Sequence, residues 1–432
     1  MKKRVVLSLS ILMILGSIIA IGNRPVHNLI EYDENTTLAL FDENGEKIAQ
    51  VPSKDSGYTL DTEKSSCTNG SISWDTESWS PVITVSGEAN GRVSCSLYFR
   101  KTTPYDECIM EYGSDSIQCS IIADVDTEGC PVVNADGTVG VTGVESTNGY
   151  LCSAPDDYGT SYYYRGNVTN NYVKFGDYYW RILRINGDGT IRIIYDGTSA
   201  HANNDSSADR QVGTSVYNSS YNDNTGVGYM YGTVGASTYE DTHANTNDST
   251  IKTYLDNWYK TNIGDKGLSS YISDTLFCND RTFNSSNSGT GAGTSLTDYR
   301  WRYGPWSSAG THYPRLACSN QNDRFTANDE VTGNGDLTYS IGLVTADEAV
   351  LAGGYSDSNS GYYLYTGNGY WTMSPSYFGG SYADVRFVSS DGNANYSSNV
   401  NSSVGIRPTL NLKADSLKLG DGSAGNPYMV EG

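Results

Sequence analysis

The clearest alternation of apolar and polar residues lies at residues 383–388, where every second side chain is apolar. An Asp-Gly pair follows at residues 391–392, and such a pair is typical of a tight hairpin turn. The pattern predicts a strand, a turn and a return strand, and the return strand closes on residues 404–412. Pro408 indicates an edge position or a bulge there, because proline cannot donate a ladder hydrogen bond. Between these pieces, residues 393–403 are almost entirely Asn, Ser and Tyr.

A second pair of strands is predicted near the middle of the chain. Residues 178–185 and 190–195 are rich in β-branched and aromatic side chains, and Asn-Gly-Asp-Gly at residues 186–189 supplies the chemistry of a hairpin turn. Neither strand leaves much polar surface. We therefore expect a hairpin that is covered on both faces and belongs to the core.

Two helices are predicted after this hairpin. Apolar and aromatic residues recur at three- and four-residue spacing over residues 251–259, with Asp248 or Ser249 as a cap. Thr345 and Glu348 form a capping box at the start of a shorter second helix. Long Asn-, Ser- and Gly-rich segments separate the elements, and such segments are usually either functional or disordered. Strands, two helices and long loops together indicate an α+β domain.

A set of short motifs connects this region to a known family. The motifs are Trp371, Ser374-Pro375, Val385-Arg386-Phe387-Val388, Gly405-Ile406-Arg407-Pro408 and, upstream, Asn171-Tyr172-Val173-Lys174-Phe175-Gly176, Trp180-Arg181-Ile182 and Ile341-Gly342-Leu343. They resemble the signature of a widespread family of uncharacterised bacterial surface domains, which is similar in turn to the formylglycine-generating-enzyme branch of the C-type lectin-like fold. The resemblance implies that residues 158–432 form a C-type lectin-like domain with a mostly antiparallel sheet, two helices and long loops. It implies no activity, because this fold hosts lectins, enzymes and adhesins.

The N-terminus has the pattern of an export signal. Three cationic residues at positions 2–4 precede an apolar run over residues 5–21, and small residues follow where signal peptidase needs them. We predict a signal peptide at residues 1–22 and hence a secreted or cell-surface protein. An uncleaved membrane anchor is the alternative, because an apolar run of this length can nearly span a bilayer.

Residues 28–100 are predicted to form a small β-sandwich-like module of their own, all-β in content. Several short alternating segments separated by turn residues indicate its strands. Cys67 and Cys95 would staple its core, since disulfides are expected in an exported chain. The module resembles the short cysteine-paired β modules that act as spacers in bacterial surface proteins.

The other six cysteines also indicate disulfides. Residues 101–157 form an irregular connector with four cysteines, whose gaps are too wide for a metal site and whose pairing has three possible arrangements. These four are Cys108, Cys119, Cys130 and Cys152. Cys278 and Cys318 would close an irregular loop of the C-terminal domain. Inside that loop, the Arg- and Trp-containing cluster at residues 299–303 could contact an anionic or glycan ligand, although such clusters are more often a solvated face with one buried ring.

The composition argues against several functions. The formal net charge is −21, and because an acidic surface repels phosphate groups we expect no nucleic-acid partner. None of the four histidines lies at the spacing of a metal site or a catalytic triad, and we expect no metal and no cofactor. Formylglycine-generating enzymes hold copper through a cysteine pair, whereas residues 370–412 contain no cysteine. A carboxylate pair that is distant in sequence stays open, but the sequence favours a binding protein over an enzyme.

The candidate ligand-binding residues lie in the C-terminal segment. Tyr, Ser, Gly and Asn are the residues of evolved recognition loops, and loops on a rigid frame commonly carry recognition. The candidates are Tyr370, Trp371, Tyr377, Tyr382, Arg386, Asn393, Asn395, Tyr396, Asn399 and Asn401. We therefore predict an adhesin-like surface protein that binds a glycan or a host or bacterial surface protein.

Two other functions stay open from the sequence alone. The chain could be a structural subunit of a surface layer or a pilus-like assembly, with the small β module as the polymerising part. It could also be an enzyme of the formylglycine-generating type. Within the binding hypothesis, the alternation of Asn, Ser and Tyr over residues 393–403 is similar to the variable regions of proteins diversified by retroelements.

Overall fold

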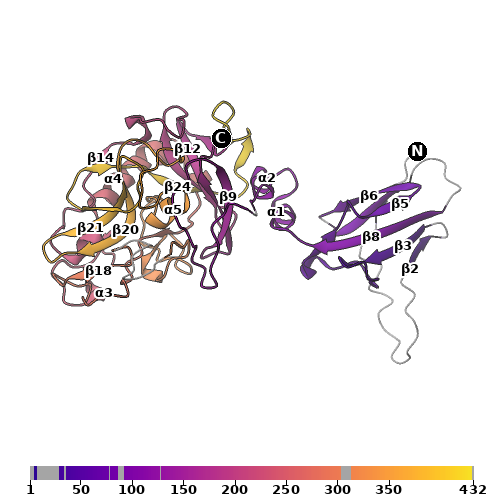
Figure 1. The fold of residues 1–432 in the computed structure, drawn as a ribbon, viewed down its shortest axis with the longest axis horizontal. Coiled ribbons are helices and arrows are strands. Elements are labelled where there is room, and N and C mark those ends of the chain that lie inside the picture. The colour runs from indigo at the N-terminus through magenta and orange to yellow at the C-terminus, as the bar shows by residue number, and fades with distance from the viewer. Residues whose placement is uncertain are drawn as a thin grey trace, which may run out of the picture. The chain divides into compact units, whose positions relative to one another are not determined.

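The computed structural model describes residues 4–6, 29–33, 36–76, 78–85, 92–126, 128–302 and 313–430. The chain forms two compact units (Figure 1). Unit 1 is Met1–Ala123 and unit 2 is Asp124–Gly432. Strands account for more of the described residues than helices do, so the fold is α+β and mostly sheet, as predicted.

Unit 1 contains a β module with two sheets. One sheet has the order β1-β7-β6, and the other has the order β2-β3-β8-β4, with β5 also paired to β8. The pair β3 and β8 is parallel. The strands are β1 (Arg4–Val6), β2 (Leu29–Asp33), β3 (Thr36–Phe41), β4 (Tyr58–Leu60), β5 (Ser66–Thr68), β6 (Gly70–Asp75), β7 (Ser80–Val85) and β8 (Val93–Lys101).

The alternation along β8 explains how the two sheets share one core. Every second side chain of β8 from Val93 to Phe99 is buried. These side chains cluster with Ile83 of β7, which belongs to the other sheet. Burying an apolar side chain of this size contributes about 1.5–3 kcal/mol relative to leaving it exposed. The disulfide between Cys67 and Cys95 joins β5 to β8 in the same core.

Two helices complete unit 1, and both lie in the predicted connector, beyond the module at residues 28–100 that the sequence predicts to be all-β. They are α1 (Pro104–Tyr112) and α2 (Ile117–Ala123). The hydroxyl of Thr103 accepts a hydrogen bond from the backbone N–H of Asp106, whose carboxylate accepts one in return, and this capping box starts α1. The disulfide between Cys108 and Cys119 joins the two helices. A helix of seven residues such as α2 is too short to show a clear helical period in the sequence.

The predicted connector, residues 101–157, contributes to both units. Its first part forms α1 and α2 in unit 1, and its last part supplies β9 (Gly149–Pro155) to unit 2. Cys130 and Cys152 form a disulfide, with Cys152 lying in β9. The four cysteines of the connector are therefore paired in sequential order.

The larger sheet of unit 2 has eight strands. Its order is β24-β13-β12-β11-β26-β25, and β10 pairs with both β12 and β9. The predicted hairpin is β12 and β13, which pair in antiparallel register, and every residue of β13 is buried. The further strands are β10 (Thr160–Gly166), β11 (Tyr172–Phe175), β12 (Tyr178–Ile185), β13 (Ile191–Gly197), β24 (Thr409–Leu412), β25 (Leu417–Leu419) and β26 (Tyr428–Val430).

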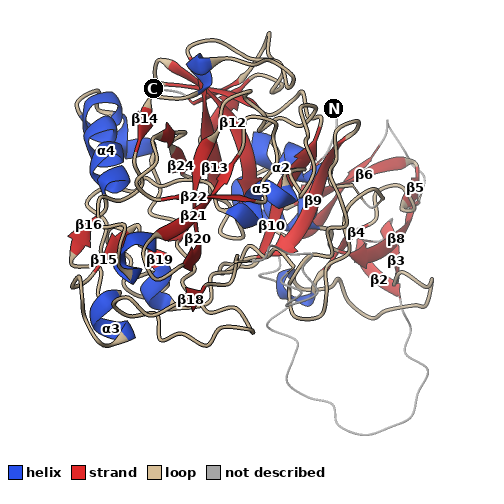
Figure 2. Cartoon of the chain, turned by 60° about the vertical axis from the view of Figure 1, so that its left-hand side comes forward, coloured by secondary structure: helices blue, strands red, loops and turns tan. Residues whose placement is uncertain are grey.

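The smaller sheet of unit 2 has six strands. Its order is β14-β23-β20-β21-β22, and β18 pairs with β20. Figure 2 shows β20, β21 and β22 side by side. The strands are β14 (Thr214–Ser215), β18 (Thr297–Asp298), β20 (Tyr370–Phe378), β21 (Ala383–Val388), β22 (Tyr396–Asn399) and β23 (Val404–Gly405).

The return strand of the C-terminal hairpin differs from the prediction. β21 pairs with β22, which lies inside the polar segment 393–403, and not with residues 404–412. Those residues form β23 and β24, and β24 pairs with β13 in the other sheet. β24 begins directly after Pro408 and is the last strand in its sheet order, but isolated bridges join its other side to Gly342 and Ile272.

The two predicted helices of the C-terminal domain are present. α4 (Thr250–Tyr259) is capped by Ser249, and α5 (Ala346–Leu351) begins with the predicted capping box. The described part of unit 2 also contains the short α3 (Tyr239–Thr242). Two small sheets join β15 (Met230–Tyr231) to β16 (Asn247–Asp248) and β17 (Phe277–Cys278) to β19 (Arg324–Phe325).

The predicted signal peptide, residues 1–22, lies outside the described residues except for β1 (Arg4–Val6). Among the helices that the structure describes, none combines the length and the apolar character that a membrane crossing requires.

Candidate functional site

A polar row crosses the six-stranded sheet of unit 2. The strand register aligns four residues opposite one another, namely Asp298 of β18, Tyr377 of β20, Asp384 of β21 and Asn399 of β22. Residues that oppose one another in antiparallel strands project from the same face of the sheet. One face therefore presents two carboxyl groups, a phenol and an amide. The Tyr377 face is defined here as Asp298, Arg302, Tyr377, Tyr382, Asp384 and Asn399.

Arg302 and Tyr382 both contact the ring of Tyr377. The guanidinium carbon of Arg302 lies 3.5 Å from the ring centroid, and its Nε pairs with the carboxylate of Asp298 at 3.2 Å. The rings of Tyr377 and Tyr382 meet edge to face with centroids 5.7 Å apart, and the Tyr377 hydroxyl donates to the Tyr382 hydroxyl at 2.8 Å. Tyr382 stays 37 % exposed. The face therefore offers an aromatic surface whose torsions are already restricted, which lowers the entropy cost of binding.

Burial alters the protonation of Asp384. It raises the pKa of this carboxyl to about 6, although the charge of Arg302 acts in the opposite direction. Burial and the charge of Arg302 together lower the pKa of Arg386 to about 9, and Asp384 partly opposes that change. Arg386 remains charged at neutral pH, whereas Asp384 loses its proton between about pH 5 and pH 7. The charge of the Tyr377 face therefore changes within that range.

Arg386 supports the face from below. Its Nε donates to the carbonyl of Trp301 at 2.7 Å, and its Nη2 donates to the carbonyl of Arg302 at 2.8 Å. Its Nη1 donates to the side-chain oxygen of Asn395 at 2.9 Å and also to the Asn395 carbonyl. Arg386 is only 3 % exposed. The sequence predicts a ligand contact at Arg386 and Asn395, and the structure instead gives both a role in fixing the backbone that carries Arg302.

Three more predicted contacts are buried. The hydroxyl of Tyr370 donates to the carbonyl of Leu364 at 2.9 Å, and the indole N–H of Trp371 donates to the carbonyl of Ser215 at 2.9 Å. Asn393 is 5 % exposed, and its amide donates to a backbone carbonyl. These side chains stabilise the sheet and its loops and are not available to a ligand in this arrangement.

The remaining candidates divide between two faces. Tyr377, Tyr382 and Asn399 come together on the Tyr377 face. Tyr396 is 50 % exposed but lies opposite Phe387, and its ring centroid is 6.2 Å from that of Phe387, so it belongs to the other face of β21 and β22. Asn401 is exposed beyond the end of β22.

Sequence reasoning missed the two carboxyl groups of the row and identified Arg302 only as part of a cluster. β18 has two residues, so no alternation could reveal Asp298. In that cluster, Arg300 and Trp301 are buried and both bond to Asp347. The alternation at residues 383–388 places Asp384 on the polar side of a strand, and this was the available signal.

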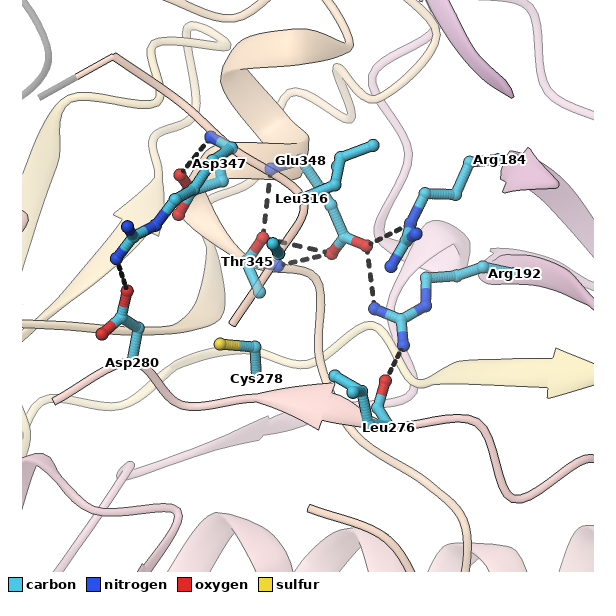
Figure 3. A pocket seen from close by; sticks show the side chains of 11 residues that line it. Arg184, Arg192, Leu276, Cys278, Asp280, Leu316, Thr345, Asp347 and Glu348 are labelled. Carbon is cyan, nitrogen blue, oxygen red and sulfur yellow. Dashed lines mark hydrogen bonds and ion pairs between the residues drawn. The ribbon is translucent and has the colours of Figure 1, made fainter. Parts of the chain in front are cut away.

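A buried network of charges surrounds the first turn of α5 (Figure 3). One carboxylate oxygen of Glu348 accepts hydrogen bonds from Arg184 at 3.1 Å and from Arg192 at 2.8 Å. Arg184 also pairs with Asp156 at 2.8 Å. Burial would raise the pKa of Glu348, but the two guanidinium groups lower it to about 2. A carboxylate of such low basicity is a poor general base at neutral pH, so this network is structural.

Within the part of the chain that the structure describes, the cysteines and histidines form no metal site. All eight cysteines form four disulfides, the fourth between Cys278 and Cys318. Among the described residues, no group of three or more His, Cys, Asp or Glu side chains is arranged to hold a metal ion. His27 and His312 lie outside the described residues.

Comparison with known proteins identifies one family over part of unit 2. Residues 318–414 match the model of a family described as a domain of unknown function, DUF6273. No similar protein was found among curated proteins, and no similar structure was found among solved structures. The matched segment contains α5 and β20 to β24, and therefore four of the six residues of the Tyr377 face. The family description assigns no activity, so the functional argument rests on geometry.

Proposed function

We propose that this protein is an exported, adhesin-like binding protein of the cell surface, which recognises a glycan or a protein through the Tyr377 face. The observation that carries the proposal is the exposed Tyr382 beside a tyrosine that is already held by Arg302. Tyrosine and arginine are the residues most often found at the energetic centres of interfaces. Tyr377 lies on the paired strand β20, and Tyr382 contacts it from the short turn before β21, which lowers the ordering cost when a partner binds.

The disulfides of the chain support a location at the cell surface. Four disulfides agree with an oxidising, extracellular environment. We also propose that unit 2 has a C-type lectin-like fold, which the mostly antiparallel sheets, α4, α5 and the long loops between them support. An enzyme of the formylglycine-generating type is disfavoured, because it needs free thiols for copper and every cysteine of this chain is in a disulfide.

The test is an array of glycans and surface proteins probed with the full chain and two matched variants. Tyr382→Ala removes the exposed ring of the Tyr377 face, and Tyr396→Ala removes an equally large exposed ring on the other face of the same strands. We expect Tyr382→Ala to weaken binding by about 2 kcal/mol, or roughly 30-fold, as at an interface hot spot. Tyr396→Ala should leave binding unchanged.

Two results would contradict the proposal. Loss of binding only in Tyr396→Ala would move recognition to the opposite face of the sheet. No binding by the unaltered chain, together with concentration-dependent assembly in sedimentation, would favour a structural subunit of a surface layer or pilus-like assembly.

A further inference from the structure

Unit 2 contains an open cavity that shares no residue with the Tyr377 face. Its volume is about 720 Å³. The wall is formed by the side of β11 at Tyr172 and by loops near residues 146, 167–169, 200–204, 360–361 and 424. A cavity of roughly 300–1,000 Å³ is the usual size for a bound small molecule.

The chemical character of the wall is unusual for this chain. No lining residue is Asp, Glu, Lys, Arg or His, although the whole chain has a net charge of −21. Ser146, Thr169, Asn204 and Ser360 all line the cavity and are exposed. Within the described residues, none of these four side chains has a hydrogen-bond partner in the protein. Their hydroxyl and amide groups are therefore free to bond to a ligand.

Arg181, which packs on the ring of the lining residue Tyr172, is turned to other partners. The guanidinium group of Arg181 lies 3.8 Å from the ring centroid of Tyr172, is fully buried, and donates to Asn171, Asn203 and a backbone carbonyl. The hydroxyl of Tyr172 donates to the carbonyl of His201 at 2.5 Å. A carboxylate or phosphate ligand would find no counter-charge in the cavity, and burying such a group without one is costly.

The loops around the cavity are held in place by hydrogen bonds. Asn203 donates to the side-chain oxygen of Asn167 at 2.7 Å and to the carbonyl of Val168 at 2.8 Å. Asn359 donates to the carbonyl of Glu145 at 2.8 Å and accepts from the backbone N–H of Gly361 at 2.9 Å. These bonds join the walls to one another, so the cavity is formed before a ligand enters and binding costs little ordering.

We propose that this cavity is a second binding site, which takes a short neutral saccharide. Such a ligand has many hydroxyl groups and no charge, and it fits a wall of uncharged donors and acceptors. No free aromatic face is available for stacking, because Arg181 covers one face of the Tyr172 ring and Tyr172 is only 3 % exposed. Affinity at this site comes mainly from hydrogen bonds and is weak, in the millimolar range.

The test is calorimetric titration of the full chain with neutral trisaccharides, namely maltotriose, cellotriose, triacetylchitotriose and mannotriose, and with sialyllactose as a charged comparison. We expect at least one neutral trisaccharide to bind and sialyllactose not to bind. Thr169→Trp and Asn204→Trp fill the cavity from exposed positions, and each should weaken binding at least tenfold. Tyr382→Ala, which alters the Tyr377 face alone, should leave this binding unchanged.

Hydrogen exchange of the unaltered chain keeps the proposal testable if the tryptophan variants fold poorly. The bound trisaccharide should slow exchange in segments 200–204 and 359–361. The proposal is overturned if no neutral trisaccharide binds, if sialyllactose binds more tightly, or if protection appears at β20 to β22 instead. A result of that last kind would assign the saccharide to the Tyr377 face and leave the first proposal standing.

Discussion

Replacing Glu348 by Gln should destabilise unit 2 strongly, even though it changes a single oxygen. One carboxylate oxygen of Glu348 binds both Arg184 and Arg192, and the other accepts from the backbone N–H of Thr345 at 2.9 Å. Gln can still cap the helix through its side-chain oxygen. It cannot neutralise the two guanidinium groups, whose side chains are at most 5 % exposed.

The size of the effect can be obtained in two ways. Removing one partner of a buried ion pair costs about 3–5 kcal/mol, because the other charge stays buried without compensation. The second, independent way uses the pKa of Glu348. Burial raises this pKa and the two arginines lower it, and the net change is a fall from 4.5 to about 2. At about 1.36 kcal/mol for each pKa unit, that fall corresponds to about 3 kcal/mol of stability. Because the folded pKa is depressed, this stability is present above about pH 4.5 and is lost as the pH falls through 2.

Urea unfolding at pH 7 measures the change. Glu348→Gln should lower the free energy of unfolding of unit 2 by about 3 kcal/mol without changing the slope, while the transition of unit 1 stays in place. Lys418→Met removes an ion pair with Asp415 that is partly exposed, and should change stability by less than about 0.5 kcal/mol. A loss below about 1 kcal/mol in Glu348→Gln would refute the argument that this network stabilises the domain through its charges.

Three further variants test other parts of unit 2. Burial raises the pKa of Asp384 from 3.8 to about 6, so protonation favours the folded state and this stability is lost as the pH rises through 6. Asp384→Asn should therefore raise the urea midpoint at pH 8 and leave it unchanged at pH 4. A lower midpoint at pH 8 would contradict this reasoning. Replacing Cys278 and Cys318 by Ala removes a link between residues 40 positions apart and should cost about 4 kcal/mol in the chain-entropy account, so an unchanged midpoint would show that the link does not contribute. Arg386→Ala leaves backbone carbonyls unsatisfied and should cost about 3 kcal/mol or more, whereas lost binding at unchanged stability would make Arg386 a direct ligand contact.

The elements that the sequence predicts correctly are those specified by neighbours in the chain. The hairpin of β12 and β13 has its turn residues between two apolar strands, and both faces are buried as expected. The capping box of Thr345 and Glu348 starts α5. In each case the residues that determine the element lie within a few positions of one another, so a local pattern carries the information.

The return strand was missed because its partner choice depends on distant contacts. Residues 404–412 have the stronger apolar alternation, but this serves to bury β24 against β13, more than 200 positions earlier. β22 is the last strand of its sheet and is only partly covered, so it needs no apolar face and reads as a polar loop. The row of the Tyr377 face depends on this pairing, and could not be assembled before the register was known.

The pairing of β21 with β22 also decides which positions of the polar segment 393–403 can vary, if this segment is diversified to change the ligand. The Asn393 amide donates to the carbonyl of Ser356, and the side-chain oxygen of Asn395 accepts from the buried guanidinium group of Arg386. Replacing either by Ser or Tyr should lower the free energy of unfolding by about 1–3 kcal/mol. Tyr396 and Asn401 are exposed and should accept any of these residues, but neither lies on the Tyr377 face. Of these five positions, Asn399 is the one that is both partly exposed and on that face, so its replacement should alter ligand binding at unchanged stability. A display library of single substitutions at these five positions, sorted first for folded protein and then for ligand binding, measures both effects. Two results together would contradict both the register and the assignment of the Tyr377 face: folded protein with any residue at positions 393 and 395, and ligand binding that does not change when Asn399 is replaced.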